Sequence, residues 1–159
     1  MPRAKKPPLP FVEQMKKLIA SGINDSPKIV INDDCDALTP LEDRVQRILG
    51  LSDNARKRKD RMLFFVMYDI ESDKVRRLVV KYLIREGCTR IQKSIFLADR
   101  PIETYNKIKS DLTEVQAVYD NDDSIIVLPV TTDYLRMMKV IGKNIDVDII
   151  THGKNTLFF

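Results

Sequence analysis

The feature that most constrains the fold is the stretch from Met62 to Phe96, where an apolar segment leads directly into a basic amphipathic segment. The part from Met62 to Tyr68 is almost wholly apolar and stops at one carboxylate, Asp69. We expect a buried β-strand here, because short apolar runs of this length are typical of core strands. Asp69 would then lie at the carboxyl-terminal end of the strand, where ligand-binding groups often gather.

The residues after Asp69 predict a helix with one buried face. Ser72 is a candidate N-cap, and Gly87 is a candidate end of the helix. The apolar residues recur at spacings of three and four: Val75, Leu78, Val79, Tyr82 and Leu83. The basic residues fall mostly on the remaining surface: Lys74, Arg76, Arg77, Lys81 and Arg85. From Arg90 to Phe96 the chain alternates with period two, which predicts a half-buried strand and completes a β-α-β unit.

A second unit of the same kind follows. Apolar residues with helical spacing predict a helix over about 101–118, and Asn121-Asp122-Asp123 predicts a turn. A strand is expected over 124–130, where Pro129 indicates a strand end or an exposed edge. A short helical turn over about 134–140 and a final strand over 145–151 complete the chain. Two β-α-β units in series predict an α+β sandwich with helices on one face.

The first 61 residues predict a small, mostly helical extension. Thr39-Pro40-Leu41-Glu42 has the capping-box pattern, and the apolar residues after it end at Gly50, which we expect to stop that helix. A second helix is expected over 10–20, and residues 28–31 fit a short strand or an extended contact. These pieces are too small to form a core alone. They should dock on the main domain, a dimer mate or another protein, and the sequence does not choose.

The excess positive charge lies in this extension. Residues 1–61 hold 13 Lys and Arg against 9 Asp and Glu, whereas residues 62–159 hold 14 against 14. The densest run is Arg56, Lys57, Arg58 and Lys59, which we interpret either as a linker that follows nucleic-acid phosphates or as a merely solvated linker. We therefore divide the chain into an extension (1–53), a basic linker (54–61) and a main domain (62–159).

Composition excludes several classes of protein. No span is long enough to cross a bilayer, and Pro7-Pro8-Leu9-Pro10 replaces the apolar core of a signal peptide. Cys35 and Cys88 lack the spacing of a zinc site or a redox pair, so a reducing cytoplasm fits. His152 is the only histidine, which leaves little basis for a histidine nuclease or a nucleophilic triad.

These motifs together resemble the CRISPR-associated protein 2 family, the small partner of the CRISPR integrase in spacer acquisition. The shared features are the strand ending in Tyr68-Asp69, Arg76, the run Arg90-Ile91-Gln92-x-Ser94-Ile95-Phe96, and the strand Asp123 to Pro129. The resemblance covers about 62–159 and not the first 61 residues. Leu78 departs from the arginine of some members, and Leu97-Ala98-Asp99 departs from their usual glycine-acid turn. Met62 lies where members commonly begin, yet the capping-box helix favours a genuine extension.

The resemblance implies a ferredoxin-like fold with an added C-terminal strand, and a homodimer in which the Asp69 side chains of both protomers hold one Mg²⁺. It also implies nucleic-acid contacts near Tyr68, Arg76, Arg77, Arg90, Ser94 and Phe96. From the residues alone, Asp69 fits equally well as an acid that stabilises the next helix. Glu71 and Asp73 fit helpers in magnesium binding but fit acids at the helix start better. Likewise, the arginines fit solvated or ion-paired side chains, Ser94 fits a backbone partner, and Phe96 fits the core.

Two functions are compatible with this resemblance. The first is an adaptation scaffold that bridges CRISPR integrase dimers and binds double-stranded DNA. The second is a magnesium-dependent nuclease that cuts RNA or DNA through the paired Asp69. The alternative is a stand-alone, toxin-like metal-dependent endoribonuclease of similar fold. The apolar residues Leu157, Phe158 and Phe159 predict a docking tail for the integrase or for a protomer.

Overall fold

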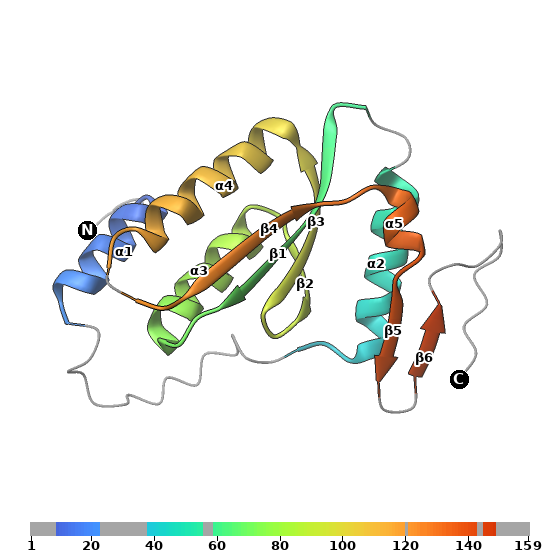
Figure 1. Cartoon of the computed structure of the whole chain (residues 1–159), viewed down its shortest axis with the longest axis horizontal. Helices are drawn as coiled ribbons and strands as arrows, with labels where there is room; N and C mark the ends of the chain where they lie inside the picture. Colours follow the sequence, from blue (N-terminus) through green and yellow to red (C-terminus); the bar gives the residue numbers. More distant parts are fainter. Residues whose placement is uncertain (1–8, 23–37, 56–58, 120, 143–144, 149–159) are drawn as a thin grey trace, which may run out of the picture.

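The computed structural model describes residues 9–22, 38–55, 59–119, 121–142 and 145–148 (Figure 1). Its centre is a four-stranded antiparallel sheet with the order β2-β3-β1-β4. The elements of this part are β1 (Arg61–Asp69), α3 (Asp73–Arg85), β2 (Thr89–Gln92), β3 (Ile95–Pro101), α4 (Ile102–Gln116) and β4 (Ser124–Pro129). Two split β-α-β units with this strand order form the ferredoxin-like α+β fold that the sequence predicts.

Both faces of the central strand β1 are covered, which explains its nearly continuous apolar sequence. Phe64, Val66 and Tyr68 point to the face that α3 and α4 cover, where they belong to the larger hydrophobic core. Leu63 points to the opposite face and packs in a second cluster, with half-buried Phe65 beside it. Because side chains alternate along a strand, a strand buried on two sides needs apolar residues at successive positions.

The chain from Arg90 to Phe96 is a hairpin, so the prediction of a single strand was wrong. Strand β2 ends at Gln92, the chain turns at Lys93-Ser94, and β3 begins at Ile95. The register shifts between Arg90 and Gln92, as at a β-bulge. A turn of two residues between short strands preserves the period-two alternation, and the pattern alone therefore does not reveal it.

The two helices of the extension form, with one change of length. Helix α1 (Phe11–Ala20) lies where the sequence predicts it, whereas α2 (Leu41–Ala55) continues past Gly50. The expected stop at Gly50 was wrong because Leu49 and Leu51 pack on the second cluster. Tertiary contacts of this kind outweigh the cost of about 1 kcal/mol for glycine inside a helix. Residues 28–31, and residues 56–58 of the linker, lie outside the described ranges.

Both extension helices dock on the main domain of their own chain. Phe11 and Met15 of α1 are buried in the larger core, beside α3 and α4. Val45 and Ile48 of α2 are buried as well, and Ile48 contacts the second cluster on the opposite face of the sheet. Figure 1 shows the two helices on opposite sides of the sheet. Of the three docking partners that the sequence left open, the structure thus selects the main domain.

The C-terminal part forms a small hairpin of its own. Helix α5 (Thr132–Arg136) is followed by β5 (Lys139–Gly142) and β6 (Ile145–Asp148), which pair antiparallel in a separate two-stranded sheet. The expected helical turn over 134–140 was thus placed too late and overlaps a strand. The extra C-terminal strand is confirmed over 145–148, and it pairs with β5. No helix within the described ranges is long and apolar enough to span a bilayer.

Candidate functional site

Asp69 is the last residue of β1, and its side chain is exposed. The antiparallel pairing places it opposite Ser124, the first residue of β4, and α3 begins a few residues later at Asp73. The sequence predicts this position correctly. Within the described ranges the Asp69 carboxylate forms no hydrogen bond and no ion pair, so it is available to a ligand.

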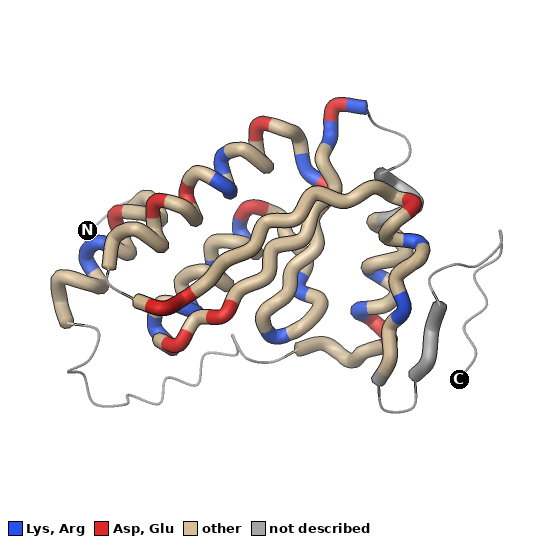
Figure 2. Tube along the Cα trace, viewed as in Figure 1, with Lys and Arg blue, Asp and Glu red and all other residues tan. Residues whose placement is uncertain are grey.

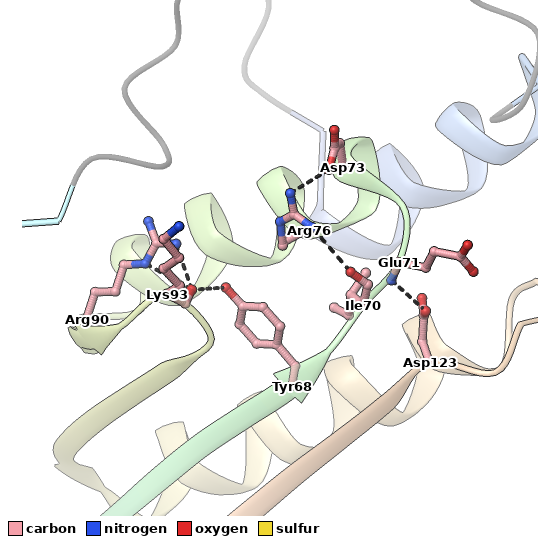
Figure 3. Close-up of polar contacts among 8 residues, drawn as sticks. All are labelled: Tyr68, Ile70, Glu71, Asp73, Arg76, Arg90, Lys93 and Asp123. Carbon is pink, nitrogen blue, oxygen red and sulfur yellow. Dashed lines mark hydrogen bonds and ion pairs between the residues drawn. The ribbon is translucent and has the colours of Figure 1, made fainter.

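Asp123 fixes the loop that follows Asp69 (Figure 3). Its Oδ1 accepts a hydrogen bond of 2.9 Å from the backbone N–H of Glu71, and its Oδ2 accepts one of 2.5 Å from the Tyr119 hydroxyl. Burial and this hydrogen bond raise the pKa of Tyr119 above its ordinary value, so the hydroxyl remains a donor. Asp123 therefore tethers the end of β1 to the start of β4, and both its oxygens are occupied.

The sequence pattern assigned Asp123 to a turn and to the start of the following strand, and gave it no role beside Asp69. The information that could have revealed its role is the antiparallel order of β1 and β4, which brings the start of β4 beside the end of β1. An acid just before one strand then lies near an acid at the end of the other.

Arg76 is engaged on the first turn of α3. Its Nη2 lies 2.5 Å from Asp73 Oδ1, and its Nη1 donates to the Ile70 carbonyl at 3.4 Å. The ion pair is exposed on the Asp73 side, and the hydrogen bond to Ile70 joins the helix start to the residue that follows β1. The neighbouring Arg77 is half-buried on the same helix. The structure thus confirms that the arginine is ion-paired, one of the two roles that its position allowed.

Tyr68 and Arg90 meet at the hairpin turn. The Tyr68 hydroxyl donates to the Lys93 carbonyl at 3.0 Å, and Arg90 donates to the same oxygen through Nε at 3.2 Å and Nη2 at 2.6 Å. The Ser94 carbonyl accepts from the Tyr68 N–H at 3.1 Å. These contacts fix the shape of the turn and leave the Lys93 side chain exposed.

The aromatic rings of this group lie inside the protein. Phe96 is fully buried and Tyr68 is nearly so, with their centroids 6.2 Å apart and the Arg90 guanidinium 5.9 Å from the Phe96 centroid. A ring without exposed surface supports the hairpin from beneath and has no face on which a base can stack. The expected nucleic-acid contact at Phe96 therefore has no exposed side chain in this structure, and its other predicted role, in the core, is confirmed.

The remaining predicted residues lie elsewhere. Lys59 is exposed just before β1, at the opposite end of that strand from Asp69 and roughly 26 Å or more away at the usual rise per residue. Six of the predicted site residues lie outside the described ranges: Arg56, Lys57, Arg58, Leu157, Phe158 and Phe159. The structure therefore brings together Tyr68, Arg90, Ser94 and Phe96, and it places Lys59 apart from them.

The opposite end of β1 carries an ion pair. Arg61 Nε lies 3.1 Å from Asp99 Oδ1, and Arg61 also donates to the Asp99 carbonyl. Asp99 is the one buried charged side chain in the part of the chain that the structure describes. This contact closes the β1–β3 pairing at the end far from Asp69 and is structural.

Asp69 can supply one ligand to a divalent cation. Mg²⁺ usually takes one or two protein carboxylates together with water and phosphate oxygens. Among the described residues no three acidic, histidine or cysteine side chains are grouped so as to hold a metal. The exposed carboxylate of Asp69 supplies one such ligand.

The strand order and the two helices on one face define a ferredoxin-like α+β protein, with an exposed acid at the end of β1. Residues 62–138 match the family model of CRISPR associated protein Cas2, and this segment of the chain therefore belongs to the Cas2 family. Membership supports a CRISPR-associated function. The match begins in β1 and ends after α5, so α1 and α2 precede it. No curated protein matches the chain.

Proposed function

We propose that the protein is a dimeric scaffold of CRISPR spacer acquisition, which bridges integrase dimers and holds double-stranded DNA for insertion into the array. The observation that carries this proposal is the Cas2 match over 62–138, which spans the whole ferredoxin-like sheet and both of its crossover helices. The scaffold role needs a dimer surface and a surface for DNA, and the described residues offer a candidate for each.

Strand β4 supports the dimer. It pairs with β1 on one side only, so it is an edge of the four-stranded sheet. Ile125 and Val127 pack on the larger core, whereas Ile126 and Leu128 point the other way and are 55% and 45% exposed. An edge strand with exposed apolar side chains favours pairing with another chain. A two-fold axis beside β4 would bury this surface against its own copy.

Asp69 supports a second activity of the same dimer, the magnesium-dependent cleavage of a phosphodiester. Asp69 lies next to Ser124 of β4, so an axis near the start of β4 brings the two Asp69 carboxylates together. A shared Mg²⁺, when bound, would supply an activated water and offset charge on the leaving oxygen. Asp123 keeps the loop beside Asp69 in place, which leaves the carboxylate free to act as a ligand.

Co-purification with the CRISPR integrase, combined with the mass of the protein in solution, tests the scaffold proposal. We expect a dimer at micromolar concentration, integrase bound to it, and duplex DNA bound to the complex. Ile126→Lys/Leu128→Lys should give a monomer that fails to bridge integrase dimers. The matched control Ile84→Lys changes an equally exposed apolar residue on α3 and should keep the dimer. A wild-type monomer at micromolar concentration would contradict the proposal.

A further inference from the structure

A group of basic side chains from three separate elements lies on the side of the sheet that α2 covers. Figure 2 shows Lys and Arg on the β2–β3 hairpin, on α2 and on the segment from α5 to β5. We call this group the α2–hairpin surface; its members are Arg44, Arg47, Lys93 and Arg136. Helix α2 packs against β2 and α5, so the members lie on adjacent elements.

Arg44 joins the extension to the hairpin. Its Nη1 donates a hydrogen bond of 2.6 Å to the Ile91 carbonyl in β2, and its Nε is buried without a partner in the described part. Ile48, one turn further along α2, packs on Ile91, Leu63, Leu97 and Leu135. Polar and apolar contacts thus fix α2 on the hairpin, and the charges of the two elements keep a constant separation.

The contacts of this surface hold its basic side chains in place but do not neutralise their positive charges. Arg44 donates to a backbone carbonyl, and no ion pair to Arg44, Arg47, Lys93 or Arg136 occurs within the described ranges. Elsewhere Arg61, Arg76 and Lys107 do have carboxylate partners. The nearest acids in sequence are Glu42, Asp43 and Asp133, in the first turns of α2 and α5, where acids stabilise helix starts.

This arrangement suits an extended polyanion. The charges are spread over a helix, a turn and a second helix, and they do not converge on one pocket, as a site for a small phosphate would require. Nucleic-acid backbones present regularly repeated phosphates, and neutralising them releases counterions, which favours binding to such a surface.

We propose that α2, which lies outside the Cas2 match, contacts the phosphates of double-stranded DNA through Arg44 and Arg47, together with Lys93 of the hairpin. The inference deepens the proposed function, because it assigns part of the DNA surface to the extension, and it rests on that function. It gives the extension a binding role beside its structural one.

Arg47→Gln/Lys93→Gln tests the inference with the full-length protein and a duplex DNA probe. Both side chains are exposed, and the Tyr68 and Arg90 hydrogen bonds use the Lys93 backbone carbonyl, so the fold should be kept. Loss of two phosphate contacts should lower the slope of log Kobs against log salt by about 1.8. The matched control Lys17→Gln/Lys109→Gln removes the same charge from α1 and α4 and should leave the slope unchanged.

A reduced slope for Arg47→Gln/Lys93→Gln alone supports the inference. Equal losses in both double variants would show a net-charge effect and overturn it. Wild-type binding in Arg47→Gln/Lys93→Gln, with weaker binding in Arg76→Gln/Arg77→Gln, would overturn the inference and leave the proposed function standing. Failure of the wild-type protein to bind the duplex, or a strong preference for single-stranded RNA, would overturn both.

Discussion

The ring of Phe11 stacks on the ring of Tyr82, with centroids 4.0 Å apart and planes inclined by 11°. Phe11 belongs to the extension, and Tyr82 belongs to helix α3 of the Cas2 segment. On its other side Tyr82 is fixed, because its hydroxyl donates to Asp111 Oδ2 at 2.6 Å. Burial, and to a smaller extent this hydrogen bond, raises the pKa of Tyr82, so the hydroxyl stays protonated and the contact persists at neutral pH.

Phe11→Ala should lower the free energy of unfolding by about 3–4 kcal/mol, because it removes a buried ring and leaves a cavity beside Tyr82. Equilibrium denaturation in urea measures this change. Val12→Ala, at a half-buried neighbouring position, should cost much less. A loss below about 1 kcal/mol for Phe11→Ala would show that α1 does not dock as the structure has it.

Removal of residues 1–61 should expose apolar surface on both faces of the sheet. Helices α3 and α4 would lose the Phe11 and Met15 contacts, and Leu63, Ile91, Leu97 and Leu135 would lose the cover of α2. We expect a protein that begins at Met62 to melt at a lower temperature and to form larger species than the full-length chain. Light scattering and thermal unfolding check this. A truncated protein with the mass and melting temperature of the full-length one would contradict it.

Buried Cys88 predicts a loss of stability at high pH. Burial raises the pKa of its thiol from 9.0 to about 12, although the nearby Arg100 opposes the shift. The thiol ionises near pH 9 in the unfolded chain and stays neutral in the folded one. The free energy of unfolding therefore keeps its full value below pH 9 and falls above it. The expected loss is about 1.4 kcal/mol per pH unit up to about pH 12. In Cys88→Ala the decline should begin only near pH 10, where unfolded tyrosines ionise. Denaturation at stepwise pH tests this, and identical profiles would refute it.

The hydrophobic pattern was sufficient to predict β1, α3, α4, β4 and the position of Asp69 at the end of β1, because each depends on local spacing and on which residues must be buried. The hairpin at Lys93-Ser94 was missed, since a short turn leaves the alternation intact. The end of α2 was missed because the packing of Leu51 outweighs the tendency of Gly50 to end a helix. The docking of Phe11 on Tyr82 and the tether through Asp123 depend on segments distant in sequence, and local patterns do not encode such pairings.

The tail Leu157, Phe158 and Phe159 lies outside the described ranges, and its role remains a prediction. Deletion of these residues should weaken integrase binding while the dimer persists, because exposed apolar termini often dock on a partner. A pull-down with the integrase measures the effect. A chain in which all three are replaced by serine keeps the length and serves as a control. Unchanged complex formation by the deletion variant would exclude the integrase as the partner of the tail.

Spacer acquisition by Asp69→Asn separates a scaffold from an enzyme whose metal site is needed in the cell. The amide keeps the shape of the side chain and removes its charge, and Asp122→Asn provides a control at a neighbouring exposed acid. We expect Asp69→Asn to abolish magnesium-dependent cleavage, while the dimer, the integrase complex and the insertion of new spacers persist. Loss of new spacers from a complex that still assembles would contradict a role as scaffold alone and make the carboxylate essential for acquisition.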